Sequence, residues 1–107
     1  MGVGNTKTFR SRKYLDAVRE MRCVFTGRHG DDSETVDPAH IGTAGKGLKS
    51  PDNEVLPVIH GIHAEMHTRG EMTVLRERAP DDLLRAMARA YARELYREWE
   101  NEQVADA

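Results

Sequence analysis

Three of the five histidines in this chain lie close together, at His60, His63 and His67. His63 and His67 are four residues apart, so on a helix they share one face, about one turn from each other. An imidazole pair with this spacing is a common way for a helix to bind a divalent metal ion. The spacing therefore predicts a metal-binding helix, with an accidental pair as the alternative. His29 and His60 are expected to lie outside the ligand set, because single histidines are common in proteins.

A further histidine, His40, follows the short segment Asp37-Pro38-Ala39 upstream of this helix. Two tasks are common for histidine: proton transfer as a general base, and binding of a divalent metal ion. Imidazole suits both tasks, because it binds divalent metals through one nitrogen and its pKa lies near neutrality. We therefore expect His40 and the histidine helix to form one site, joined by the loop over residues 42–52.

The 42–52 loop contains three glycines, a proline and the basic residues Lys46 and Lys49. It does not match a nucleotide-binding P-loop, because Lys46 is followed by Gly47 instead of serine or threonine. Both lysines are candidates for contacts with phosphate, and solvation of the loop is the alternative.

Hydrophobic periodicity predicts the elements that must position these residues. We expect helices over residues 8–22, 62–69, 71–79 and 83–102, and short strands over residues 23–27 and 35–41. Gly70 is well placed to end the histidine helix. The apolar residues of the last helix form one stripe, which predicts an amphipathic helix packed on the core.

The same helix carries arginines four residues apart, at Arg85, Arg89, Arg93 and Arg97. Such a row could follow the phosphates of a nucleic acid. We favour a solvated face instead, because exposed ion pairs are common on amphipathic helices. The acidic partners expected for this face are Asp81, Asp82, Glu94 and Glu98.

The charge is unevenly distributed, although the net charge is only −2. Residues 1–30 carry seven basic and two acidic side chains, a balance of +5, which leaves −7 for the remainder. A basic arm can contact phosphates without making the whole protein basic, so a nucleic acid is a candidate partner. Arg12 and Lys13 lie in this arm, and Arg69 lies beside the histidine pair. A solvated tail is the alternative.

The length of 107 residues predicts a single domain over 1–107 with a modest core. One cysteine excludes an intramolecular disulfide and favours a reducing cytoplasm. No apolar run reaches the length of a membrane span and no secretory signal precedes the domain, so we expect a cytoplasmic protein without membrane insertion.

Four short segments occur in an order that resembles an HNH-type endonuclease domain, also called the ββα-metal or His-Me finger fold. They are Ala39-His40, residues 47–52, residues 56–59 and His63-x-x-x-His67-x-x-Gly70. More narrowly, the chain is similar to the phage nucleases of the Ref-type recombination group, and its histidine helix is similar to that of the colicin DNases. The resemblance implies an α+β fold. A small ββα-metal core over residues 23–70 would be flanked by an N-terminal arm and helix (1–22) and by C-terminal helices (71–104).

The resemblance also implies residue roles. His40 would be the general base, and His63 and His67 would hold a divalent ion such as Mg²⁺, Mn²⁺, Ni²⁺ or Zn²⁺. Many members carry an acidic or histidine ligand where this chain has Ala39, so Asp37 is the candidate for a further ligand. Either Asp52 or Asn53 would orient His40 through its other ring nitrogen.

Relatives in this family often bind a structural zinc through four cysteines. The corresponding positions here are Cys23, Thr26, Ile59 and Ile62, so three of the four ligands are missing. A four-coordinate zinc site cannot be built from them. We therefore predict no structural zinc, and instead an apolar cluster of Cys23, Phe25, Ile59 and Ile62.

The function implied by the resemblance is metal-dependent hydrolysis of DNA by a phage- or prophage-encoded protein, with phage or host recombination or packaging proteins as further partners. One alternative is a nuclease fold that binds DNA or a protein without cutting. The missing acidic ligand at Ala39 and the missing zinc site favour it, whereas the retained histidines favour the enzyme. A second alternative is a phage assembly component that dimerises through its long C-terminal helix. The oligomeric state stays open.

Overall fold

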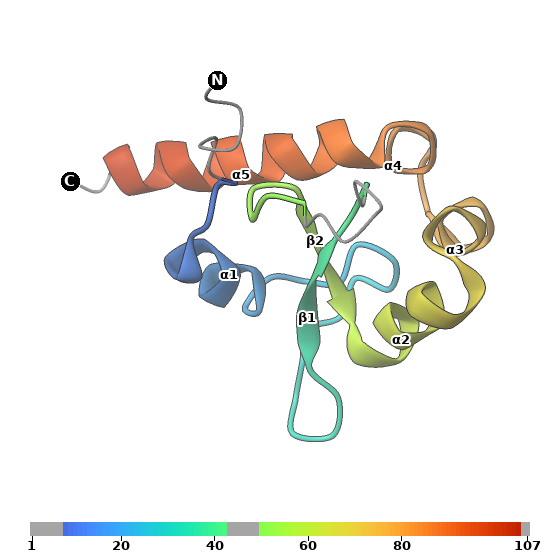
Figure 1. Ribbon diagram of the computed structural model, residues 1–107. Coiled ribbons are helices and arrows are strands. Elements are labelled where there is room, and N and C mark those ends of the chain that lie inside the picture. Colours follow the sequence, from blue (N-terminus) through green and yellow to red (C-terminus); the bar gives the residue numbers. More distant parts are fainter. Residues whose placement is uncertain (1–7, 43–49, 106–107) are drawn as a thin grey trace.

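A two-stranded antiparallel hairpin stands at the centre of the protein and is surrounded by helices (Figure 1). The computed structural model describes residues 8–42 and 50–105. Strand β1 (Val36–His40) pairs with β2 (Val55–Ile59), and Val36 lies opposite Ile59 while His40 lies opposite Val55. The helices of the described residues are α1 (Arg12–Val18), α2 (His60–Arg69), α3 (Glu71–Arg78), α4 (Asp82–Ala86) and α5 (Ala88–Ala105). The fold is therefore mixed α+β with a long C-terminal helix.

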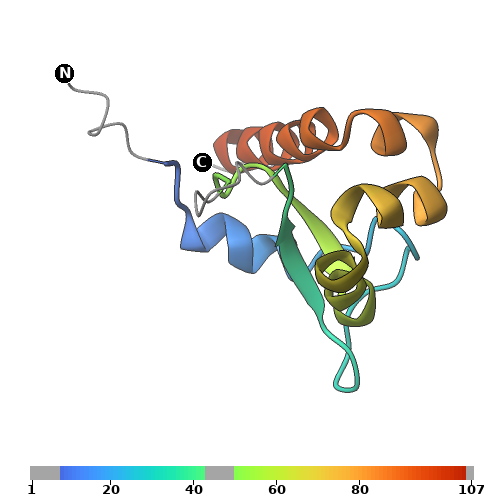
Figure 2. The same cartoon turned by 45° about the vertical axis from the view of Figure 1, so that its right-hand side comes forward.

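Both faces of the hairpin are covered, which explains why every residue of β2 is buried. Figure 2 shows α1 on one side of the strands and α2 and α3 on the other. On the α2 side, Ala39, Leu56 and Val58 belong to the main core with Met66 and Leu75. On the α1 side, the side chain of Val55 packs with residues of α1 and α5, namely Tyr14, Val18, Tyr96 and Trp99. Because successive side chains of a strand alternate between faces, the hairpin separates two groups of residues.

The strand expected over residues 23–27 is wrong. This segment is a turn, closed by bonds from Cys23 N to the carbonyl oxygen of Arg28 and from Gly27 N to that of Cys23, both 2.8 Å. Gly27 takes a φ of 75°, which favours glycine. The true partner of β1 is residues 55–59, an apolar segment that follows the 42–52 loop. The two strands therefore bracket that loop.

Several helix boundaries differ from the predictions. α1 covers residues 12–18 only, and it begins where the Ser11 hydroxyl accepts a bond of 3.1 Å from Tyr14 N. The helix expected over 83–102 is interrupted at Met87, whose φ of −137° and ψ of 52° lie outside the helical range. The Asp81 carboxylate accepts from Leu84 N at 2.7 Å and caps the N-terminus of α4, the short helix before the break. Within the described ranges, no helix is both long and apolar enough to cross a membrane.

Candidate functional site

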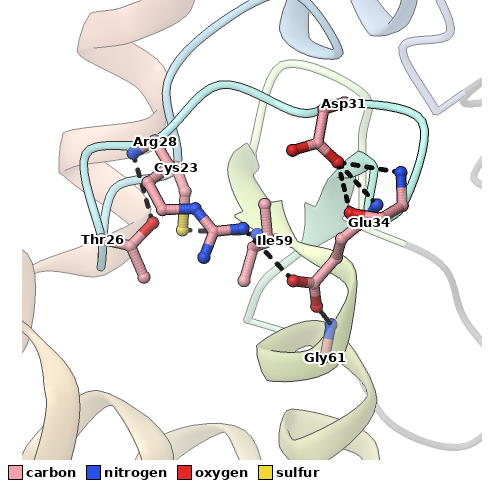
Figure 3. Close-up of polar contacts among 8 residues, drawn as sticks. Cys23, Thr26, Arg28, Asp31, Glu34, Ile59 and Gly61 are labelled. Carbon is pink, nitrogen blue, oxygen red and sulfur yellow. Dashed lines mark hydrogen bonds and ion pairs between the residues drawn. The ribbon is translucent and has the colours of Figure 1, made fainter.

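The N-terminal end of α2 is held in place by the loop that precedes β1. The backbone N–H of His60 donates to the carbonyl oxygen of Thr35 at 2.8 Å. The Glu34 carboxylate accepts from Gly61 N at 2.8 Å and also lies 3.4 Å from the guanidinium of Arg28 (Figure 3). A carboxylate at a helix N-terminus is favourable because it meets free N–H groups and the positive end of the dipole. These contacts fix where α2 leaves the hairpin.

A side chain at position 61 would displace the Glu34 carboxylate. A Cβ atom there would lie 2.8 Å from Oε2 of Glu34. Glu34 is in turn presented by a tight turn, in which Oδ1 of Asp31 accepts from the backbone N–H groups of Ser33 and Glu34, both at 2.9 Å. The start of the histidine helix therefore depends on a turn that lies far from it in the sequence.

Asp37 of β1 joins two imidazoles of α2. Its Oδ2 accepts from Nδ1 of His60 at 2.7 Å and from Nδ1 of His63 at 3.0 Å, and its Oδ1 accepts from the hydroxyl of Thr35 at 2.9 Å. Burial by itself raises the pKa of Asp37. The hydrogen bonds from His63, His60 and Thr35 outweigh burial and hold that pKa below its ordinary value. Asp37 is therefore a carboxylate, and each Nδ1 carries the proton that it donates.

His63 and His67 turn their remaining nitrogens toward each other. The two Nε2 atoms are 3.2 Å apart, and the ring centroids are 4.8 Å apart. Two nitrogens bound at about 2.0–2.1 Å to one tetrahedral ion would be about 3.3 Å apart. Because Asp37 fixes the proton of His63 on Nδ1, the Nε2 atom of His63 carries a lone pair. The contact is a hydrogen bond from Nε2 of His67 to Nε2 of His63, so an ion would take the place of the shared proton. The spacing of the two nitrogens matches two neighbouring positions around one divalent ion.

Asp37 lies outside this pair, contrary to its predicted place in the ligand set. It contacts the Nδ1 side of His63, opposite to the Nε2 atom that faces His67. Across residues 8–42 and 50–105, no three His, Cys, Asp or Glu side chains are grouped so that they could hold a metal ion. Asp37 thus orients His63, and any ion on the pair would complete its coordination with water or substrate.

His40 forms a second group at the end of β1. Its Nε2 lies 2.8 Å from Oδ1 of Asp52, so Asp52 rather than Asn53 is its partner. The same oxygen accepts from Arg10 at 3.0 Å, and Oδ2 accepts from Ser11 N at 2.8 Å. Burial raises the pKa of Asp52, but the bonds from His40, Ser11 and Arg10 together hold it below its ordinary value. His40 therefore donates from Nε2, and its Nδ1 carries the lone pair.

The structure does not unite these two groups into the single site that the sequence predicts. Asp37 and His40 are three residues apart on β1, which places them on opposite faces of the hairpin and about 10 Å apart along the strand. Asp37 contacts α2, whereas His40 contacts Asp52, which in turn accepts from Arg10 and Ser11 before α1. The histidine pair and the expected base are therefore separated by the strand itself.

The residues expected to contact DNA are distributed unevenly. Arg12 is exposed, and the amine of Lys13 lies 5.9 Å from the ring centroid of Trp99. Arg69 is already paired with Glu65 at 3.3 Å and with Glu77 at 2.8 Å. Lys46 and Lys49 lie outside the described residues. Arg12 and Lys13 are exposed, and within residues 8–42 and 50–105 neither forms an ion pair with a carboxylate.

The sequence did not indicate that Glu54 is a buried partner for Arg89 and Arg93 of α5. Glu54 is buried, and Oε2 accepts from Nε of Arg93 at 2.6 Å while Oε1 lies 3.4 Å from Arg89. The predicted solvated face is correct for Arg85, which pairs with Asp82, and for Arg97, which pairs with Glu94. No local pattern identifies Glu54, because its partners are far away in the sequence.

The apolar cluster predicted in place of a zinc site is present. Cys23 and Ile59 are buried with Val36, and Phe25 and Ile62 pack against them. The sulfur of Cys23 accepts from the backbone N–H of Ile59 at 3.3 Å (Figure 3) and from that of Phe25 at 3.4 Å. Thr26 is exposed and lies outside the cluster. Three of the four zinc-ligand positions thus meet in space and form part of the core.

Comparisons with known protein families, with curated proteins and with solved structures found no match for this chain.

Proposed function

We propose that the protein is a small metal-dependent endonuclease that hydrolyses DNA phosphodiester bonds. The observation that carries the proposal is the facing pair of Nε2 atoms on His63 and His67, 3.2 Å apart, with Asp37 on the other nitrogen of His63. A hairpin followed directly by a histidine-bearing helix is also the element order of the ββα-metal nucleases that the sequence resembles. The phage origin and the recombination or packaging partners implied by the resemblance belong to the same proposal.

Each residue of the site has a definite task in this reaction. His63 and His67 would hold the ion, and the Asp37 carboxylate keeps the His63 ring in one tautomer. A divalent ion in this position supplies a positive charge for the phosphate and for the departing oxygen. Arg12 and Lys13 lie on α1, on the other side of the hairpin from the pair (Figure 2), and would add sequence-independent attraction for the DNA backbone. His40 is the base that the sequence predicts, and its lone-pair nitrogen lies on the far face of β1.

Conversion of supercoiled plasmid to nicked circles tests the proposal. We expect nicking by the wild-type protein with at least one of Mg²⁺, Mn²⁺, Ni²⁺ and Zn²⁺. His63→Ala and His67→Ala should each lose both metal affinity, measured by titration calorimetry, and nicking. His29→Ala is the matched control, because His29 is an exposed histidine outside both groups. A wild-type protein that nicks with none of the four ions would contradict the proposal.

The separation of His40 from the histidine pair favours a second function, in which the fold binds DNA without cutting it. This function predicts binding of a labelled duplex, seen by fluorescence anisotropy, that weakens steeply as salt is raised. It also predicts that Arg12→Ala and Lys13→Ala lower the affinity for several unrelated duplexes by similar factors. Salt-sensitive binding without nicking would support this function over the nuclease.

A further inference from the structure

We propose that His60 is the general base that acts beside the His63–His67 pair, an inference that rests on the proposed nuclease function. His60 is the first residue of α2, and it shares one carboxylate oxygen of Asp37 with His63. From the sequence, His60 is expected only to lie outside the ligand set. Its placement on the same face of the hairpin as the pair comes from the start of α2 and from the direction of the Asp37 side chain.

Hydrogen bonding sets the chemistry of the ring. Asp37 accepts the proton-bearing Nδ1 of His60 at 2.7 Å, so Nε2 carries the lone pair. The side chain of His60 is 66% exposed, compared with 23% for His63, so this lone pair is open to water. A carboxylate behind an imidazole holds the ring in position and stabilises the imidazolium that forms when the ring takes a proton.

The proposed step is balanced within the site. Nε2 of His60 takes one proton from a water molecule, and the water oxygen forms a bond to phosphorus. The bond between phosphorus and the departing sugar oxygen breaks, and that oxygen keeps the electron pair until it is protonated from solvent. Next to the ring, a shallow polar cavity that is open to solvent and lined by residues 32–35 gives water access to the ring.

The charged groups around His60 support a base beside a bound cation. Besides Asp37, the neighbouring carboxylates are those of Asp32 and Glu34, which line the same cavity, and Arg28 pairs with Glu34. These carboxylates attract a divalent ion by their negative charge. His40 has no comparable relation to the pair, because it lies on the opposite face of β1 and is bonded to Asp52.

The test uses the full-length protein with the ion that gives the fastest nicking. His60→Ala should lower the nicking rate by about 10²- to 10⁴-fold, which is the usual loss of a general base. Imidazole added to the solution should restore part of the rate, because the ring removed is exposed. His60→Asn keeps an N–H donor for Asp37, so its calorimetric affinity for Ni²⁺ should equal that of the wild type while nicking is lost. His29→Ala again serves as the control: its nicking rate should equal that of the wild type, and added imidazole should not change it.

Two results would overturn the inference and leave the nuclease proposal standing. One is a His60→Ala protein that nicks at the wild-type rate while His40→Ala does not nick, which would return the base to His40. The other is a loss of nicking in His60→Ala that imidazole does not restore and that parallels a loss of Ni²⁺ affinity, which would reduce His60 to a structural role. A wild-type protein without nicking activity would instead remove the proposed function and this inference together.

Discussion

Arg93 of α5 donates from Nε to Oε2 of Glu54 at 2.6 Å, although the two residues are far apart in the sequence. Glu54 is 4% exposed and lies in the turn before β2, and its carbonyl oxygen accepts from Ile41 N at 3.1 Å. Ile41 directly follows His40 in the sequence. This ion pair therefore ties the long C-terminal helix to the end of the hairpin that presents His40.

Removal of Arg93 should leave a buried carboxylate short of a partner. We expect Arg93→Ala to lower the free energy of unfolding by about 1–3 kcal/mol, the usual cost of an unsatisfied buried group. Arg93 is itself 63% exposed and Arg89 stays near Glu54, so values above this range are not expected. Urea denaturation measures the change. Arg97→Ala is the control, because its pairing with Glu94 is exposed at both ends and should contribute at most about 0.5 kcal/mol. Equal losses for the two variants would show that burial of Glu54 does not matter.

Gly42 and Gly27 both have positive φ angles, 62° and 75°, but only Gly42 is crowded. A Cβ at Gly27 meets open space, whereas a Cβ at Gly42 would overlap the guanidinium of Arg89, which donates to the Gly42 carbonyl oxygen at 2.7 Å. Gly27→Ala should therefore lose about 1–2 kcal/mol, the cost of a left-handed conformation for a residue with a Cβ. Gly42→Ala should lose clearly more in the same urea experiment. Identical losses would mean that Arg89 moves aside without cost.

Stability should fall in acid because of Asp37 and Asp52. Hydrogen bonds hold both pKa values below their ordinary range although burial opposes this. A group whose pKa is lower in the folded state stabilises the fold fully above its unfolded pKa of about 4, and this contribution is lost as the pH falls through the folded pKa. We expect the unfolding free energy of the wild type to decline below about pH 4.

Asp52→Asn should show a shallower decline over the same pH range, because its side chain cannot be protonated. Urea denaturation at several pH values between neutrality and strong acid gives the slope. Asp16→Asn is the matched control, since Asp16 is 62% exposed and pairs only with neighbouring Arg19 in the contacts described. A decline in Asp52→Asn as steep as that of the wild type would count against the role given to this carboxylate.

The cluster around Cys23 leads to a prediction about metal removal. Cys23 is 2% exposed among apolar side chains, and its sulfur is occupied by two backbone N–H donors. We expect a chelator to leave the thermal unfolding midpoint of His63→Ala unchanged, because that variant lacks the proposed ion on the histidine pair. The Cys23 thiol should react slowly with a thiol reagent in the folded protein. Elemental analysis provides the second measurement. One equivalent of zinc that survives dialysis and disappears in Cys23→Ser would refute a zinc-free core.

The sequence by itself determined the local features of this protein. The spacing of His63 and His67 placed both on one helix face, and Gly70 ended that helix with a φ of 99°. The isoleucines at positions where relatives carry cysteine predicted an apolar cluster, which is present. Apolar side chains gain free energy when they pack together out of water. These features depend on residues that are close in sequence or on simple composition, so a pattern can reveal them.

Only the tertiary structure decided how these pieces are arranged. The pairing of residues 36–40 with 55–59 was not evident, because an apolar segment does not specify its partner and a turn at 23–27 looked like a strand. Strand alternation then separated His40 from Asp37, whereas the start of α2 brought His60 onto the same carboxylate as His63. The tertiary fold also brought the Glu54 carboxylate into contact with Arg93 of α5. Each of these relationships joins residues that are distant in the chain, and register and packing, which set such contacts, are absent from any local pattern.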